Sequence, residues 1–113
     1  MGDEATDAVV PWLTLVVAGD SMEPALREGD RLLARRVDNP GALAEGSVVA
    51  VRRPDRPDLV LVKRLVRRDA DGWWVEGDNA ARSDDSRTFG PVPDALVLAE
   101  VRARLWPRPR RRP

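Results

Sequence analysis

The stretch "DLVLVKRLVRR", Asp58–Arg68, is the longest segment of the chain with the pattern of a β-strand. Leucine and valine alternate on either side of Lys63, and successive side chains of a strand point to opposite faces of the sheet. Asp71-Gly72 then forms a turn signal before the shorter segment "GWWVEG", Gly72–Gly77. The two segments therefore predict a β-hairpin with antiparallel pairing.

Short apolar segments of the same kind occur on both sides of this hairpin, separated by turn residues. They are Trp12–Val17, Asp30–Val37, Ser47–Arg53 and Ala95–Trp106. The last of them also has a composition that suits a helix, and we expect the first to be a buried strand. Ten prolines and eight glycines punctuate the chain, with a turn at Asn39-Pro40-Gly41. This spacing of short strands predicts a mainly β domain with an antiparallel sheet and little helix.

The length of 113 residues suits one compact domain. We expect residues 1–106 to form that domain, and residues 107–113, which are arginine and proline only, to be a disordered tail. The apolar run Ala8–Ala18 is about half as long as a bilayer requires, and Pro11 interrupts it. The acidic residues before it are unlike those of a signal peptide. We therefore expect no signal peptide and no transmembrane helix, and a location in the cytoplasm or peripheral to a membrane, with a peripheral contact through Trp12 left open.

The composition excludes several kinds of site. The chain has no cysteine and no histidine. It therefore contains no disulfide, no thiolate nucleophile, no Ser-His-Asp triad and no imidazole or cysteine metal site, and we expect no metal and no cofactor. The 19 basic and 19 acidic residues cancel, so the net charge does not predict a nucleic-acid partner.

Lys63 is the only lysine among the 19 basic residues. Arginine does not lose its proton in proteins, so Lys63 is the one basic side chain that can accept a proton. Strand periodicity places it on the same face as Leu59, Leu61 and Leu65. Burial among leucines would lower the pKa of the ammonium and leave a neutral amine. The alternative is a lysine that extends from the strand edge into water, and the strand by itself favours that alternative.

Ser21 lies on a turn within "VAGDSMEPALREGD", Val17–Asp30. A serine hydroxyl is a poor nucleophile unless a base lies within hydrogen-bond reach. Gly19 allows a tight turn and leaves room for an acyl group, and Pro24 stiffens the turn. The alternative is a turn serine that bonds only to its own backbone.

A polar loop, "GDNAARSDDSRTFGPVP", follows the hairpin over Gly77–Pro93. Functional residues often lie on such loops. Ser83 is suited to a hydrogen bond near a site, and Asp85 and Arg87 are spaced to form an ion pair that fixes the loop. The alternative is a surface loop of solvated charges, where an exposed pair contributes only about 0–1 kcal/mol.

Three motifs, "GDSMEPALREGD", "VKRL" and "GDNAARSDDSRTFGPVP", together resemble the signal peptidase I family of Ser/Lys proteases, over residues 16–101. The first motif is shared with LexA-type self-cleaving repressors, whereas the third is similar to the signal peptidase branch. The resemblance implies an antiparallel sheet or partly open barrel of the signal peptidase/LexA catalytic-core type. It also implies a groove in which a peptide adds as a strand, with small residues just before the cleaved bond.

Position by position, the resemblance implies that Ser21 is the nucleophile, Lys63 its general base and Ser83 the serine that orients the lysine. It implies that the Ser21 N–H is one oxyanion donor. A second donor is left open, because Gly19 stands where many relatives have a serine. Further positions either support the site or line the substrate groove; they are Gly77, Asn79, Asp85 and Arg87, and Gly19, Asp20 and Met22.

The expected partner is a precursor protein with a cleavable leader. The chain looks most like the short maturation proteases associated with nickel-type superoxide dismutase, because few residues separate Lys63 from Gly77 and no membrane anchor is expected. Two alternatives remain. One is a self-cleaving LexA-type regulatory domain, although only 20 residues precede Ser21. The other is a non-catalytic module that binds anionic partners through its arginine-rich tail.

Overall fold

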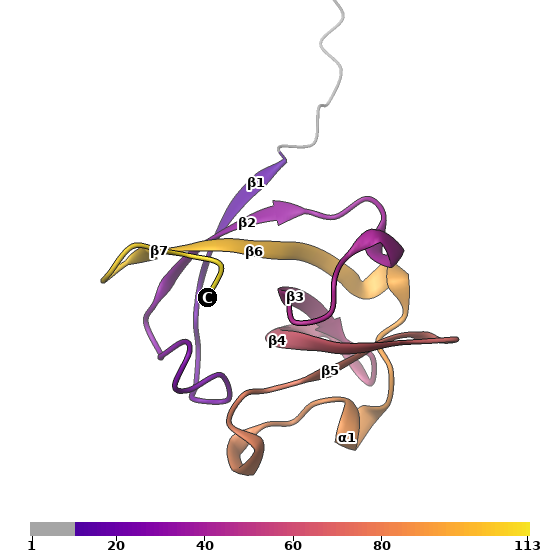
Figure 1. Cartoon of the computed structure of the whole chain (residues 1–113). Coiled ribbons are helices and arrows are strands. Elements are labelled where there is room, and N and C mark those ends of the chain that lie inside the picture. The colour runs from indigo at the N-terminus through magenta and orange to yellow at the C-terminus, as the bar shows by residue number, and fades with distance from the viewer. Residues whose placement is uncertain (1–10) are drawn as a thin grey trace, which may run out of the picture.

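A computed structural model describes residues 11–113, so the acidic start of the chain and Ala8–Val10 lie outside the described residues. Seven strands form one antiparallel sheet with the order β1-β2-β6-β3-β4-β5, and β7 pairs with β6 (Figure 1). The strands are β1 (Trp12–Val16), β2 (Arg31–Arg36), β3 (Val48–Arg53), β4 (Arg56–Asp69), β5 (Gly72–Glu76), β6 (Val97–Trp106) and β7 (Arg110–Arg111). The helices are one short α1 (Ser86–Phe89) and three 3₁₀ turns, η1 (Pro40–Ala42), η2 (Ala80–Arg82) and η3 (Asp94–Leu96). The predicted fold class, mainly antiparallel β with little helix, is confirmed.

The predicted hairpin is present as β4 and β5. Asp69 lies opposite Gly72 in the register, so two residues connect the strands. The segment that suited either a helix or a strand is β6, in which buried Val97, Ala99 and Val101 alternate with less buried residues. Period-two burial of this kind fits a strand whose inner face packs on a core.

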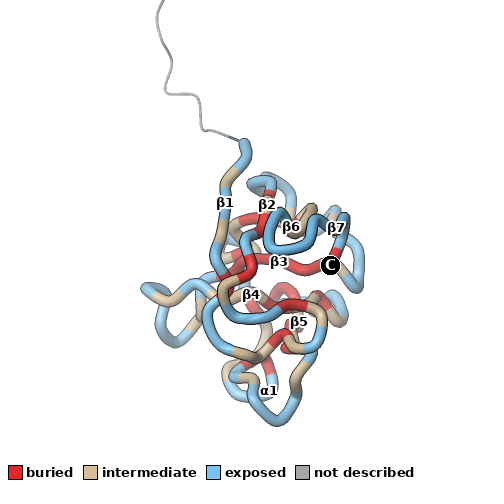
Figure 2. The backbone as a smooth tube through the Cα atoms, turned by 90° about the vertical axis from the view of Figure 1, so that its left-hand side faces the viewer, coloured by how far each residue is buried: buried red, intermediate tan, exposed pale blue. Residues whose placement is uncertain are grey.

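Hydrophobic cores lie on both faces of the central strands. Val48 and Ala50 of β3 pack in one cluster, whereas Val49 and Val51 pack in the other. Figure 2 shows β3 as buried through the middle of the molecule. A strand buried on both faces reads as a near-continuous apolar run, which fits "VVAV", Val48–Val51, in the sequence.

The prediction that Trp12–Val17 is a buried strand is wrong for most of its length. Along β1 exposed residues alternate with half-buried ones, and Trp12 and Val16 are 40% and 66% exposed. β1 is an edge strand, and only its inner face packs against the core, through Leu13 and Leu15. Sequence periodicity identifies such a strand but does not say whether a second layer covers its outer face.

The segment 107–113 differs from the predicted disordered tail. It turns back along β6, where Arg110–Arg111 form β7 and the Arg112 N–H donates to the Arg102 carbonyl at 3.0 Å. Pro113 is buried, and its carbonyl accepts a hydrogen bond from Arg64. Backbone hydrogen bonds to β6 hold this segment. They cannot be predicted from its amino-acid composition.

No helix in residues 11–113 is long and apolar enough to cross a bilayer. Across the same residues, no group of three acidic side chains is placed to hold a metal ion.

Candidate active site

Lys63 is a buried amine on β4. It lies directly opposite Val49 of β3, and its side chain faces the core cluster that contains Leu65. The residue is only 3% exposed, so its ammonium does not extend into water. Burial lowers the pKa of Lys63 below its ordinary value, and this effect outweighs the opposing charges of Asp85 and Asp84. The neutral amine, which can accept a proton, is thereby favoured.

Ser83 connects Lys63 to a carboxylate. Lys63 Nζ donates to Ser83 Oγ at 2.9 Å, and Ser83 Oγ donates to Asp85 Oδ2 at 2.8 Å. A serine hydroxyl has one proton, and here that proton points at the carboxylate. Ser83 therefore accepts from the lysine. A neutral Lys63 that gives one N–H to Ser83 keeps its lone pair for a different partner.

Asp85 is the fixed charge at the base of this chain of hydrogen bonds. Its side chain is fully buried and caps α1 by accepting from the Arg87 N–H at 3.1 Å. It also accepts from Arg87 Nε at 2.9 Å and from the Gly77 N–H at 2.9 Å. Burial alone raises the pKa of Asp85, but the hydrogen bonds from Arg87, Gly77 and Ser83 outweigh it and hold the pKa well below its ordinary range.

The segment Gly77–Asn79 touches both the lysine side and the serine side of the site. A Cβ on Gly77 would lie 2.3 Å from Ser83 Oγ and 2.6 Å from the Ser21 carbonyl oxygen, so only glycine fits. The Asn79 N–H donates to the Ser21 carbonyl at 2.8 Å, and Asn79 Nδ2 donates to the Asp20 carbonyl at 3.1 Å. The turn that carries Ser21 is thus packed against the loop that holds Lys63.

Ser21 and Lys63 line one cavity of about 220 Å³. The other lining residues come from the end of β1, the Ser21 turn and the first half of β4; they are Leu15, Val16, Val17, Ala18, Met22, Val60, Leu61 and Val62. Ser21 is partly exposed, so it is open to a ligand, whereas Met22 is 1% exposed and also packs in the core.

Two of the predicted groove residues lie beside this cavity and do not line it. Gly19 has a φ of +78°, a conformation suited to glycine, at the turn before Ser21. The Asp20 carboxylate points to the surface, where it pairs with Arg82 Nε at 3.3 Å.

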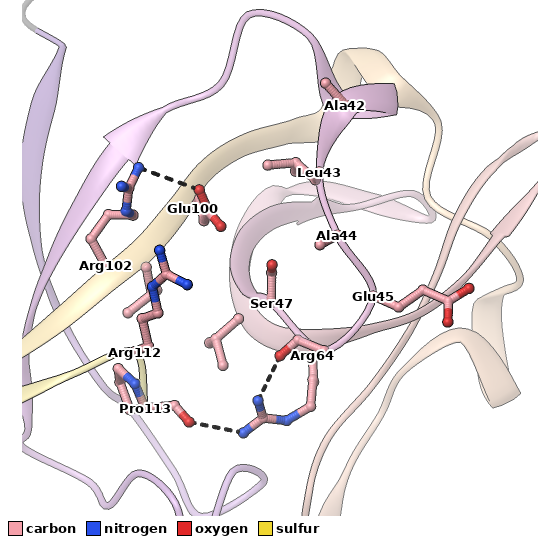
Figure 3. A pocket seen from close by; sticks show the side chains of 13 residues that line it. Ala42, Leu43, Ala44, Glu45, Ser47, Arg64, Glu100, Arg102, Arg112 and Pro113 are labelled. Atoms are coloured by element: carbon pink, nitrogen blue, oxygen red, sulfur yellow. Dashed lines mark hydrogen bonds and ion pairs between the residues drawn. The ribbon is translucent and has the colours of Figure 1, made fainter.

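A larger cavity of about 480 Å³ lies elsewhere and contains none of the predicted site residues (Figure 3). It opens between the loop before β3, β6 and the C-terminal segment. Its charged lining residues are Glu45, Arg64, Glu100, Arg102 and Arg112. Neither Ser21 nor Lys63 lines this larger cavity, so it is not the site that the sequence predicts.

A family model described as Peptidase S24-like matches residues 8–89, which is most of the chain. The chain belongs to the Peptidase S24-like family. Mitochondrial inner membrane protease subunit 1 of Xenopus tropicalis is 30% identical over 82% of this chain and 68% of its own length. Mitochondrial ATP-independent inner membrane protease subunit 1a of Arabidopsis thaliana is 33% identical over 83% and 70%. Mitochondrial inner membrane protease subunit 2 of Saccharomyces cerevisiae is 30% identical over 80% and 66%.

In this Peptidase S24-like chain, sequence reasoning missed the pairing of Arg64 with Asp78. Arg64 Nε and Nη2 donate to the two carboxylate oxygens of Asp78, both at 2.9 Å. Arg64 follows Lys63 on β4 and points to the opposite face, so this bidentate pair ties the Gly77–Asn79 segment to the strand of the lysine. Both residues stand in the quoted motifs, but spacing alone does not say which of 18 arginines meets Asp78.

Proposed function

We propose that this chain is a serine endopeptidase in which Ser21 is the nucleophile and Lys63 the general base, and that it removes an N-terminal leader from a precursor protein. One observation carries the proposal: a buried lysine, held by Ser83, lines the same cavity as a partly exposed serine. Membership of a serine peptidase family and three relatives named as proteases support it.

Acylation begins when neutral Lys63 Nζ takes the Ser21 Oγ proton. Oγ forms a bond to the carbonyl carbon of the peptide, and the electron pair of the C=O bond moves onto oxygen. In this mechanism the Ser21 N–H donates a hydrogen bond to this oxyanion. The C–N bond then breaks, the departing amine takes the proton back from Lys63, and an ester to Ser21 remains.

Deacylation uses the same groups with water as the nucleophile. Lys63 takes a proton from the water, whose oxygen attacks the ester carbon. The ester C–O bond breaks and Ser21 Oγ recovers the proton from Lys63. Throughout both steps Asp85 stays ionised, so the Ser83 hydroxyl keeps donating its proton to the carboxylate and keeps accepting from the lysine.

Two open strand edges favour binding of the substrate as an extended peptide. One edge of β4 pairs with β3, and the other edge pairs with β5 only from Arg64 onward. Over Val60–Val62 this second edge of β4 therefore has no partner strand in the described chain. β1 pairs with β2 on one side only. A peptide that enters between them can form main-chain hydrogen bonds. The cavity of about 220 Å³ next to Ser21 favours small side chains before the cleaved bond.

The identity of the precursor is part of the proposal. Sequence resemblance suggests the precursor of a nickel-type superoxide dismutase. The three relatives are named for an inner membrane protease and not for that enzyme, which favours precursors at a membrane. Leader-bearing precursors of both kinds therefore belong in the test.

The test is cleavage of leader-bearing precursor peptides, from both membrane-targeted and nickel-superoxide-dismutase-type proteins, followed by mass spectrometry. We expect the wild-type protein to cut at one bond after a small residue, and Ser21→Ala to leave every peptide intact. The matched control is Ser47→Ala, because Ser47 is a partly buried serine that lines the other cavity. Cleavage by Ser21→Ala, or cleavage of none of the peptides by wild type, would contradict the proposal.

We propose that the chain works at a membrane surface, to which the outer face of β1, β2 and β6 binds. Trp12 stacks with Arg35, and Trp106 stacks with Arg31. Both tryptophans are exposed, with Val16 beside them on the β1 face. Tryptophan favours the bilayer interface, and arginine is attracted to anionic headgroups.

Vesicle sedimentation tests this membrane contact. We expect the wild-type protein to sediment with vesicles rich in phosphatidylglycerol, and the double variant Trp12→Ala/Trp106→Ala to stay in the supernatant. Trp74→Ala is the matched control, because Trp74 also stacks with an arginine, Arg67, but on β5. Equal sedimentation of the double variant and wild type would refute the membrane contact.

A further inference from the structure

Asn79 holds the two peptide groups that flank the Ser21 side chain. Its side chain Nδ2 donates to the Asp20 carbonyl at 3.1 Å, and its main-chain N–H donates to the Ser21 carbonyl at 2.8 Å. The Asp20 carbonyl also accepts from the Glu23 N–H at 3.2 Å, which closes the turn. Asn79 itself is fixed, because it lies at the end of the Gly77–Asn79 segment that Arg64 anchors through Asp78.

The bond to the Asp20 carbonyl determines where the Ser21 N–H points. A trans peptide group is planar, and its C=O and N–H point in opposite directions. Because the Asp20 carbonyl points at Asn79, the Ser21 N–H points away from Asn79. Within residues 11–113 this N–H has no hydrogen-bond partner, and Ser21 lines the cavity. It is therefore a free donor held in one direction.

We propose that Asn79 is the positioning residue of the oxyanion hole: its side chain fixes the Asp20–Ser21 peptide group so that the Ser21 N–H meets the developing oxyanion. This inference rests on the proposed function. Gly19 brings no hydroxyl to the turn, so the orientation of this one N–H carries more of the oxyanion stabilisation. Preorganised donors act in this way because they need no reorientation when charge develops.

The test uses Asn79→Ala in the full chain, with the peptide that the wild-type protein cleaves. The variant keeps the main-chain hydrogen bond from residue 79 to the Ser21 carbonyl. It loses only the side-chain hydrogen bond to the Asp20 carbonyl. We expect kcat to fall by about 10²-fold, as for a misplaced catalytic group. KM and the pH profile should stay unchanged, because neither substrate binding nor Lys63 is altered. The affinity of a peptide aldehyde, whose adduct with Ser21 carries the oxyanion, should fall in parallel with kcat.

Asn79→Asp and Arg82→Ala are the matched variants. Aspartate has the shape of asparagine but donates no N–H, so Asn79→Asp should lose at least as much activity. Arg82→Ala removes the surface ion pair to the Asp20 carboxylate and should keep wild-type kcat.

Three results would overturn the inference, and only one of them touches the proposed function. If wild type cleaves the peptide and Asn79→Ala keeps its kcat, Asn79 does not position the donor. The same conclusion follows if Asn79→Ala has a lower kcat, a higher KM and a lower melting temperature together. That combination is expected of a residue that only supports the fold. If wild type neither cleaves peptides nor forms the aldehyde adduct, the proposed function fails and the inference fails with it.

Discussion

Lys63→Arg is expected to lower kcat/KM for precursor cleavage by about 10⁴-fold, at the upper end of what a general base contributes. Arginine keeps the positive charge, but its pKa is too high for a neutral form to exist in a protein. The variant therefore retains any electrostatic role of Lys63 and loses the proton acceptor. The measurement is the initial rate of peptide cleavage, with circular dichroism to establish that the sheet is intact.

Two further variants separate the base from the fold. Lys63→Met fills the same buried space without a charge, so it should be folded and equally inactive. Arg67→Lys is the control on the same strand, since Arg67 is exposed and its charge is conserved. It should cleave at the wild-type rate. Activity of either Lys63 variant near that rate would eliminate Lys63 as the base.

The dependence of wild-type kcat/KM on pH is expected to show the same role of Lys63 as general base. The neutral amine is the active form, so kcat/KM rises with pH as Lys63 loses its proton. Because burial lowers the pKa of Lys63, the midpoint of this rise should lie below the ordinary lysine value of 10.5. A rise centred at or above that value would mean that Lys63 is not desolvated when it acts.

Part of this site could be predicted from local pattern. Alternation along Asp58–Arg68 placed Lys63 on the face of Leu61 and Leu65, and in the structure Lys63 and Leu65 are buried. The strand did not decide between a buried amine and an exposed one. That outcome depends on β3 lying opposite and on Ser83 twenty residues later, contacts that only the folded sheet creates.

Other features could not be predicted because they depend on which element lies next to which. The outer face of β1 is exposed because, within residues 11–113, no second layer packs over it. The C-terminal segment is held because β6 offers it free backbone groups. The partner of Arg64 is Asp78, and the walls of the cavity come from β1 and β4, which are far apart in the sequence. The pairing of Ser21 with Lys63 as nucleophile and base is likewise not contained in local pattern, and only the resemblance of the motifs suggests it.

Asp85→Asn is expected to destabilise the fold by about 2–3 kcal/mol at neutral pH, as the loss of hydrogen bonds to a buried charge would give. The Asp85 carboxylate is fully buried and accepts from Ser83, Gly77 and Arg87. An amide has one acceptor oxygen, and its NH₂ group would face one of these donors. Removing one partner of a fully buried ion pair usually destabilises a protein by more than this. Here Arg87 is 40% exposed, so water can solvate its guanidinium when the Asp85 charge is lost.

The pH dependence of this difference has a definite sign. The pKa of folded Asp85 lies below the ordinary value of 3.8, so its contribution is fully present above that value. It is lost as the pH falls below 3.8 towards the folded pKa. Urea unfolding of wild type and Asp85→Asn should therefore differ by a constant amount between pH 5 and 7, roughly one to three pH units above the unfolded pKa. The difference should shrink in more acidic solution.

Asp94→Asn is the matched control, because Asp94 forms a 2.6 Å ion pair with Arg68 in which both side chains are substantially exposed. Exposed pairs contribute little, so its unfolding free energy should stay close to that of wild type. Asp85→Asn should also slow cleavage, because Ser83 loses the acceptor that fixes its proton. Since the Asp85 charge raises the pKa of Lys63, its removal should move the rise of kcat/KM to lower pH. If Asp85→Asn unfolds like wild type and cleaves peptides with an unchanged pH profile, Asp85 neither stabilises the loop nor holds the lysine through Ser83.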